Sequence, residues 1–122
     1  MKGGAQVMYG STGKILRVDL TQGKLWDEAL DEATLRKFFG GTGLGIKYLM
    51  EEVDPKTDWT DPNNIIFLGS GPLGGSRVPG CASISFVSKG AMTNGASSTQ
   101  ANGNFGAYLK SVSYTHLTLP TN

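Results

Sequence analysis

Residues 99–106 carry the most informative polar pattern in the sequence, Thr-Gln-Ala-Asn-Gly-Asn-Phe-Gly. Three amide side chains, Gln100, Asn102 and Asn104, alternate with small residues directly before a segment that has helical character. Amides offer neutral donors and acceptors, and glycines leave backbone N–H groups bare. That combination suits the hydrogen-bonding edge of a pterin ring, while phosphate favours a helix N-terminus. The alternative is an Asn-Gly turn followed by a helix cap, and the residues alone favour it.

Two glycine-rich segments could approach an anion. Residues 69–74 fit the spacing G-x-G-x-x-G, but a dinucleotide site also needs a helix and an acid about 20 residues later. Pro72 and Pro79 interrupt this context, and no Asp or Glu follows Asp61, so a nucleotide site stays an alternative. Residues 40–45 lead into a helix whose N–H groups could meet an anion. A tight connection between two helices is the favoured interpretation there.

Few single residues could do chemistry. Arg77 is the only arginine in the second half of the sequence, and its guanidinium could bind an anion through two N–H groups. A solvated arginine on the surface is an equal alternative. Cys81 is the only cysteine, so it forms no internal disulfide and cannot alone hold an iron–sulfur cluster; we predict a small buried filler. The only histidine, His116, lies in a C-terminal tail. We assign no catalytic residue and no metal ligand.

The charges are unevenly distributed along the chain. All 10 acidic residues lie between Asp19 and Asp61, and the second half carries only Arg77, Lys89 and Lys110 as charged residues. An acid-free, glycine-rich half suits an anionic ligand, because no carboxylate repels it and bare N–H groups can approach it. The alternative is a chance scarcity of acids.

The length of 122 residues is that of one modest domain, and 39% apolar residues are ordinary for a globular protein. No apolar run is long enough for a membrane span, and the N-terminus lacks the apolar segment of a secretory signal. We therefore expect a cytoplasmic location.

Hydrophobic periodicity, caps and turn residues predict a hairpin, then helices, then further strands, which is an α+β order. The expected strands are residues 14–20, 24–28, 65–68, 82–88 and, as a short third strand of the second group, 96–98. The expected helices are residues 31–39, capped by Asp31 and stopped by Gly40, with Leu35, Phe38 and Phe39 on the apolar face, then residues 44–53 and 105–110.

Both ends of the sequence resemble translated DNA that does not encode the natural protein. Residues 112–121 resemble ten translated codons of a transposase-end sequencing adapter, so we expect residues 112–122 to be an adapter-derived tail with no place in the fold. Residues 2–4 read as a translated ribosome-binding site before Met8, so we expect residues 1–7 to be a non-native extension. The domain itself would then cover residues 8–111.

Several segments, taken in order, resemble the N-terminal domain of the tungsten-containing aldehyde:ferredoxin oxidoreductase family. The match runs from about Met8 to Lys110, and the order of the segments carries it. The segments are residues 8–10, 13–20, 40–45 and 71–75, then Pro79, Lys89 and residues 101–110. The resemblance implies the fold class α+β, here an incomplete N-terminal domain with mainly antiparallel strands and two to three helices.

The resemblance also implies a cofactor and a reaction. Family members hold tungsten, or molybdenum in some relatives, between the dithiolenes of a bis-pyranopterin, near a [4Fe–4S] cluster. They oxidise aldehydes to carboxylic acids and pass the electrons to ferredoxin. The cluster cysteines and proton-transfer residues belong to downstream domains that are absent here. This fragment alone is therefore expected to be inactive, and the cluster belongs to the full-length parent only.

The family's site residues transfer only where positions match. A pterin-contacting arginine of familiar members corresponds to Ser83, with Arg77 six residues earlier. The family's pterin loop corresponds to residues 99–103, where Gln100 keeps an amide and Asn102 stands where glycine is usual. The implied cofactor-binding residues are Arg77, Ser83, Gln100, Ala101, Asn102 and Gly103.

The leading interpretation is a fragment of an oxygen-sensitive cytoplasmic oxidoreductase from an anaerobic prokaryote. The implied partners are ferredoxin, the aldehyde substrate and the remaining domains of the parent chain, with a homo-oligomer left open and no nucleic acid or membrane. The alternatives are a related tungsten-enzyme subunit of the aromatic thioester reductase type, a stand-alone anion- or nucleotide-binding module, and a structural fragment.

Overall fold

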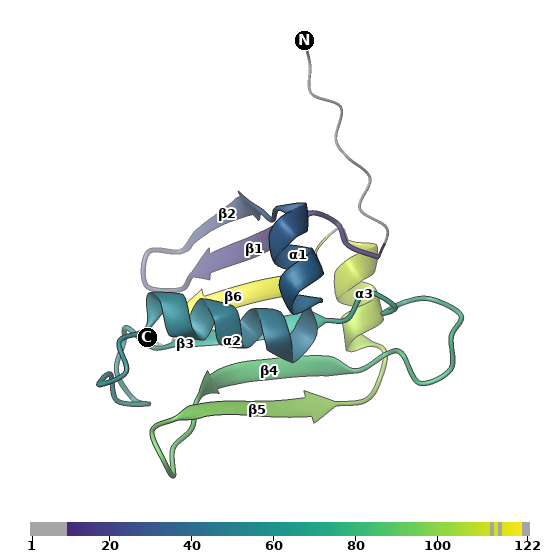
Figure 1. The fold of residues 1–122 in the computed structure, drawn as a ribbon. Helices are drawn as coiled ribbons and strands as arrows, with labels where there is room; N and C mark the ends of the chain where they lie inside the picture. Colours follow the sequence, from purple (N-terminus) through teal and green to yellow (C-terminus); the bar gives the residue numbers. More distant parts are fainter. Residues whose placement is uncertain (1–9, 113, 115, 121–122) are drawn as a thin grey trace.

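The computed structural model describes residues 10–112, 114 and 116–120, with only the backbone of residues 116, 117 and 120. Within these residues, six strands form one sheet in the order β2-β1-β6-β3-β4-β5 (Figure 1). The strands are β1 (Lys14–Asp19), β2 (Lys24–Ala29), β3 (Ile65–Ser70), β4 (Ile84–Lys89), β5 (Ala96–Ala101) and β6 (His116–Pro120). The helices are α1 (Glu32–Phe38), α2 (Gly41–Glu52) and α3 (Phe105–Ser111).

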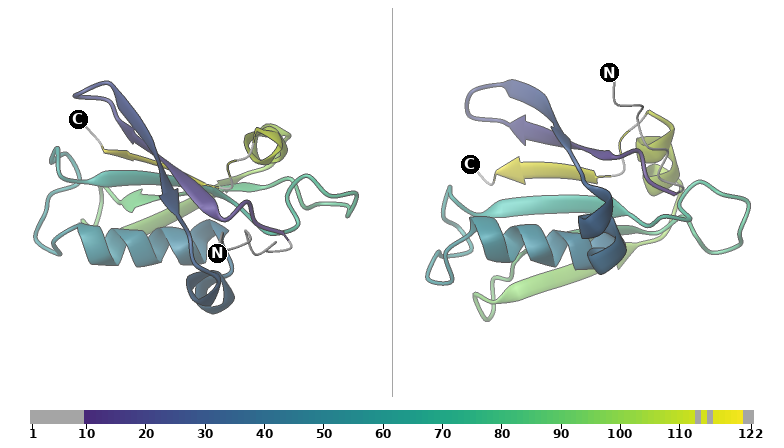
Figure 2. Two further views of the ribbon diagram at one scale, coloured as in Figure 1. Left: turned by 90° about the horizontal axis from the view of Figure 1, so that it is seen from above. Right: turned by 45° about the horizontal axis from the view of Figure 1, so that its top comes forward.

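The helices lie on both faces of the sheet. Figure 2 shows α1 and α2 on one face and α3 on the other. Neighbouring strands pair antiparallel except for β1 and β6, which are parallel. The predicted α+β class, with mainly antiparallel strands and helices added to them, is confirmed. No helix among the described residues is long and apolar enough to cross a membrane.

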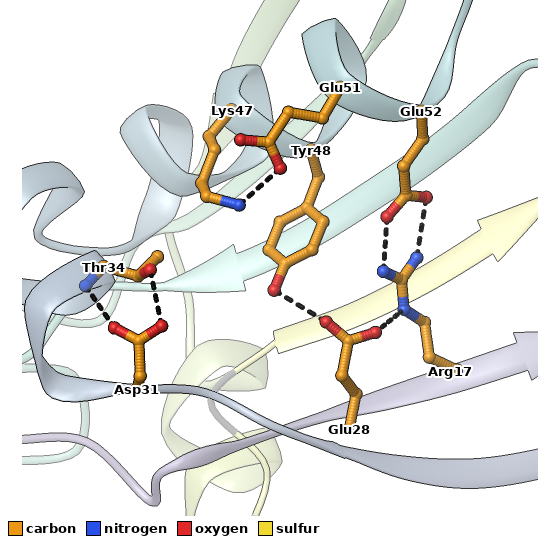
Figure 3. Close-up of polar contacts among 8 residues, drawn as sticks. All are labelled: Arg17, Glu28, Asp31, Thr34, Lys47, Tyr48, Glu51 and Glu52. Atoms are coloured by element: carbon orange, nitrogen blue, oxygen red, sulfur yellow. Dashed lines mark hydrogen bonds and ion pairs between the residues drawn. The ribbon is translucent and has the colours of Figure 1, made fainter.

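The predicted hairpin and first helix are local features, and both are present. Lys14 pairs with Ala29 and Asp19 with Lys24 across the antiparallel β1–β2 ladder. Asp31 caps α1 by accepting a 2.6 Å hydrogen bond from the Thr34 N–H (Figure 3). The expectation that Phe39 belongs to the apolar face is wrong. Phe39 ends the helix with a left-handed φ of 60° and is 73% exposed.

Helix α2 packs closely against β3 and β4, and glycine makes this approach possible. A Cβ atom at Gly45 would lie 2.6 Å from Val87 Cγ2 and 2.7 Å from Phe67 Cδ1. The core around this contact is apolar and comes mainly from α2 and the sheet, with Leu35 and Phe38 of α1 packed against it. Its buried members are Ile15, Leu30, Leu44, Tyr48, Leu49, Val53, Ile65, Phe67 and Val87.

A polar cluster ties the hairpin to α2 (Figure 3). The Arg17 guanidinium of β1 donates to Glu28 at 2.6 Å and forms two hydrogen bonds with Glu52 of α2. The Tyr48 hydroxyl donates to the other Glu28 oxygen at 2.9 Å. Burial works to raise the pKa of the Glu28 carboxyl, but the hydrogen bonds from Arg17 and Tyr48 outweigh it and lower that pKa.

The C-terminal segment is a correction to the sequence analysis. Residues 116–120 form β6, which pairs with both β1 and β3 in the middle of the sheet. Thr118 on this strand is buried between its neighbours at 2% exposure. The expectation that residues 112–122 have no place in the fold is therefore wrong for residues 116–120. Their origin as an adapter-derived tail stays a prediction, and residues 1–7 lie outside the described residues.

Three element boundaries also differ from the expected ones. Helix α2 begins at Gly41, so the glycine run forms its first turns and is more than a connection. Strand β5 extends to Ala101, so three residues of the expected pterin loop, Thr99 to Ala101, are in the sheet. Strand β4 begins at Ile84. Ladder pairing with β4 extends β5 beyond what its own sequence indicates.

The Gly45 contact predicts that Gly45→Ala destabilises the fold. Overpacking costs about 1–3 kcal/mol, and the gain in helix propensity is about 1 kcal/mol. Because both neighbours belong to the core, we expect a net loss of about 1–2 kcal/mol in chemical denaturation. Gly71→Ala is the control, since no atom lies within 4 Å of its added Cβ. Equal stability of the two variants would contradict the packing argument.

The lowered pKa of Glu28 predicts a pH-dependent effect of Glu28→Gln. The carboxylate's contribution to stability is complete above its unfolded pKa, about 4.5, and is lost as pH falls through the lower folded value. The variant should melt several degrees below the wild type at pH 7, and this difference should shrink below about pH 4.5. Glu51→Gln, which removes an exposed pair with Lys47, should change little. A difference that does not vary with pH would contradict this assignment.

Candidate functional site

Glycine-rich segments that are far apart in the sequence meet around one cleft of about 550 Å³. The start of α2 forms one wall, the loop after β3 forms another, and β4 and β5 contribute side chains between them. The lining residues are Gly40, Gly41, Thr42, Gly43, Gly71, Pro72, Leu73, Gly74, Val78, Pro79, Gly80, Cys81, Ser83, Ser85 and Gln100. None of these is charged, so the described wall offers only neutral hydrogen-bonding groups and small apolar surfaces.

The loop after β3 is held by its own turns and by α3. The Gly74 N–H donates to the Gly71 carbonyl at 3.0 Å, and the Ser76 N–H donates to the Leu73 carbonyl at 3.0 Å. From α3, the Lys110 ammonium donates to the Pro72 carbonyl at 2.5 Å. Desolvation lowers the pKa of Lys110. Helix α3 therefore holds this wall of the cleft through the half-buried Lys110 side chain.

Ser85 and Gln100 lie side by side on the floor of the cleft. They are direct partners in the β4–β5 ladder, so their side chains project to the same face. Ser85 is 7% exposed, whereas Gln100 is exposed. A serine hydroxyl beside an amide provides donors and acceptors for the polar edge of a ligand.

The six residues predicted from the sequence are not all in one place. Ser83 and Gln100 line the cleft. The Ser83 hydroxyl donates to the Asn102 side-chain oxygen at 2.7 Å, which brings these two positions together. Arg77 is exposed in the loop and is not among the residues that line the cleft.

A smaller cavity of about 180 Å³ contains the remaining predicted residues. Ala101, Asn102 and Gly103 line it together with Leu68, Ile84, Phe86 and Phe105. Successive residues of a strand point to opposite faces, so Ala101 faces away from Gln100. The segment from Gln100 to Gly103 therefore contributes to two cavities, which a loop-based interpretation could not anticipate.

Sequence reasoning missed several residues of the cleft. Thr42 lines it and forms a 2.9 Å hydrogen bond with Ser98 of β5. Cys81, expected to be a buried filler, is half-buried on the cleft wall beside Ser76. For Ser85, the only feature visible in the sequence is its place in an alternating strand. The glycine run at the start of α2 is visible in the sequence, but its approach to β4 depends on tertiary packing.

The fold and the cleft together define a class: an α+β domain whose cleft is lined by backbone and neutral side chains. Among the described residues there is no group of three or more His, Cys, Asp or Glu placed to hold a metal ion. Comparison with known proteins agrees with this class. Residues 15–120 match the model of "Aldehyde ferredoxin oxidoreductase, N-terminal domain". The chain belongs to this family.

Individual relatives show the same relationship. The "Tungsten-containing aldehyde ferredoxin oxidoreductase" of Pyrococcus abyssi is 38% identical over 84% of this chain. The "Aliphatic sulfonate oxidoreductase, WOR-like subunit" of Pyrococcus furiosus is 38% identical over 88% of it. In each case the chain spans only 17% of the relative's length.

A solved structure supports the fold. The chain superposes on the "Active site complex BamBC of Benzoyl Coenzyme A reductase in complex with 1,5 Dienoyl-CoA" with a TM-score of 0.89. The two are 27% identical, and the match covers 92% of this chain and 17% of the other. The scaffold is therefore shared by proteins whose names describe different substrates.

The Lys110 contact predicts that Lys110→Met loosens the loop after β3. Losing a hydrogen bond from a charged donor should speed amide exchange at Gly74 and Ser76 by about tenfold, as seen by hydrogen exchange. Lys89→Met is the matched control, because Lys89 donates to the carbonyl of Pro55, in a different loop. Unchanged exchange at Gly74 in Lys110→Met would show that the lysine does not hold this loop.

Proposed function

We propose that this chain forms part of the tungstopterin-binding scaffold of an oxidoreductase that converts aldehydes to carboxylic acids with ferredoxin as electron acceptor. The convergence of glycine-rich segments on one neutral cleft supports this function most directly. The names of the tungsten-containing relatives supply the reaction class. The parent enzyme's activity and partners are part of the proposal, since the chain covers only a fraction of each relative.

The donor set fits a pterin. Ser83, Ser85 and Gln100 place two hydroxyls and an amide along the cleft, and such groups match the polar edge of a heterocycle. When bound, the bis-pyranopterin would supply the redox chemistry and hold tungsten or molybdenum through its dithiolene sulfurs. The chain's own residues would bind and orient the ring. The [4Fe–4S] cluster would belong to the remainder of the parent chain.

The six predicted residues take different parts in this proposal. Ser83 and Gln100 would contact the cofactor, and Asn102 would fix the Ser83 hydroxyl through their hydrogen bond. Ala101 and Gly103 would shape the neighbouring backbone. Arg77 would need a rearrangement of its loop to reach the cleft.

The parent enzyme would be cytoplasmic and oxygen-sensitive, with ferredoxin, the aldehyde and the remaining domains as partners. Residues 8–111 would be the partial pterin-binding domain, preceded by the non-native residues 1–7 and followed by the adapter-derived residues 112–122. Reading the genomic DNA beyond the codon for Ser111 tests these boundaries. A frame that continues for several hundred codons supports them, whereas a stop codon there contradicts the enzyme proposal.

A second candidate is a related subunit that acts on another substrate, such as an aromatic thioester. The superposition of this chain on a benzoyl-coenzyme A reductase complex supports this candidate. Both reactions would use the same scaffold, so the cleft is common to the two candidates. Assays of the parent enzyme with an aldehyde and with an aromatic thioester would separate them.

Gln100 gives a direct test in the full-length parent. We expect Gln100→Ala to lower the pterin and tungsten content several-fold, measured by fluorescence of the oxidised pterin and by metal analysis. Gln22→Ala is the control, since Gln22 lies in the β1–β2 turn and uses its side-chain oxygen to accept from Lys24. Equal cofactor content in the two variants would contradict the placement of the pterin in this cleft.

A further inference from the structure

Strand β6 fills a groove between the two halves of the sheet (Figure 1). It pairs in parallel with β1, where Arg17 lies opposite Thr118, and antiparallel with β3, where Phe67 lies opposite Thr118. These ladders use backbone N–H and C=O groups, which all residue types except proline offer alike. The groove can therefore pair with extended segments of many sequences. How well a given segment fits is decided by its side chains.

The side chain of Thr118 fits the groove poorly. This residue is only 2% exposed, and its Oγ1 atom has no hydrogen-bond partner in the part of the chain that the structure describes. Of its two ladder partners, Phe67 offers an aromatic ring, and the Arg17 guanidinium donates to Glu28 and Glu52. A buried hydroxyl without a partner destabilises the folded state, because it has given up its hydrogen bonds to water.

A cavity of about 230 Å³ lies beside the same side chain. Thr118 lines it together with residues of the β1–β2 hairpin, Glu52 of α2 and Ile65 of β3. Ile65 is 8% exposed, so this part of the cavity wall belongs to the apolar interior. Because protein interiors are closely packed, a cavity beside a short buried side chain marks a place where a larger one fits. The unpaired hydroxyl and the cavity thus occur at one position of β6.

The neighbouring strands show which side chains this face of the sheet accepts. Ile15 of β1, Phe67 of β3 and Val87 of β4 lie on the same face as Thr118, and all three are fully buried and apolar. Thr118 has nearly the shape of valine but carries a hydroxyl to the same depth. An apolar β-branched side chain would keep the preference for a strand and remove the unpaired group.

We propose that the groove between β1 and β3 is an acceptor site for a strand that carries a larger, apolar side chain at the position of Thr118. Its natural occupant is the segment of the parent chain that follows Ser111. The identity of this occupant rests on the proposed function, which treats residues 112–122 as adapter-derived, whereas the side-chain requirement does not. A foreign tail would enter the groove through backbone pairing and leave its misfit at Thr118.

An isosteric substitution tests the apolar requirement in the 122-residue chain. Thr118→Val removes the unpaired hydroxyl, so the equilibrium constant for unfolding should fall about tenfold in chemical denaturation. Thr99→Val is the matched control, because Thr99 is exposed on β5 and has no buried hydroxyl to lose. Its constant should change by less than about threefold. An unchanged or raised constant in Thr118→Val would show that water or a ligand in the cavity serves the hydroxyl, and would overturn the proposal.

A larger side chain tests whether the cavity belongs to the occupant. Thr118→Ile adds a methyl group that the cavity beside it can hold, so this variant should be at least as stable as Thr118→Val. Both variants are measured by the same denaturation. A stability below that of Thr118→Val would show that the groove has no room beyond valine, and would overturn the larger occupant.

The genomic DNA beyond the codon for Ser111 identifies the occupant. The codons in place of those for residues 112–122 should encode an apolar strand, with a residue such as isoleucine or leucine where Thr118 stands. Genomic codons that reproduce residues 112–122, or that place a polar residue at this position, would overturn the parent segment as the occupant. If the frame stops there while both variants stabilise the chain, the proposed function fails and the side-chain requirement of the groove stands.

Discussion

The close contact between α2 and the sheet at Gly45 is the constraint on which the cleft depends. The glycine allows the helix backbone to lie against Phe67 and Val87. One turn earlier on the same helix face is Gly41, and two residues earlier on the same strand face is Ser85. Four helical residues and two strand residues both advance by about 6 Å, so the two elements stay in step. The packing that builds the core therefore also places the helix start over Ser85.

A second set of interactions holds the other half of the sheet to the same helix. Arg17 lies between Glu28 of the hairpin and Glu52 near the end of α2, and its guanidinium lies 4.9 Å from the centre of the Tyr48 ring. Tyr48 in turn stacks on Phe67 in the core, with 5.9 Å between ring centres. Helix α2 thus carries both the ion pair of Glu52 with Arg17 and the apolar stacking of Tyr48 on Phe67. Helix α2 is anchored to the hairpin at its C-terminal end and presents its N-terminal end to the cleft.

The sequence was informative where structure is local. The hairpin, the Asp31 cap and the helix after Asn104 follow from alternation and capping, which neighbouring residues determine. The family itself was recognisable from the order of its glycine segments. The sequence was uninformative where distant segments meet. Neither the insertion of β6 between β1 and β3 nor the pairing of Ser85 with Gln100 has a local signal. The split of residues 100–103 between two cavities likewise follows from their position at the end of a strand.

The position of β6 has a consequence for how the chain acquires its structure. The hairpin β1–β2 and the group β3–β4–β5 share no ladder, and β6 alone joins them within the described sheet. The β1–β6 ladder pairs Ile15 with His116, which lies about one hundred residues later in the chain. This ladder therefore cannot form until His116 has been synthesised. During synthesis the two halves of the sheet would emerge as separate units with open edges, and such edges can pair wrongly. Closure of the described sheet is thus a long-range step, because it requires β6 to pair with the distant strand β1.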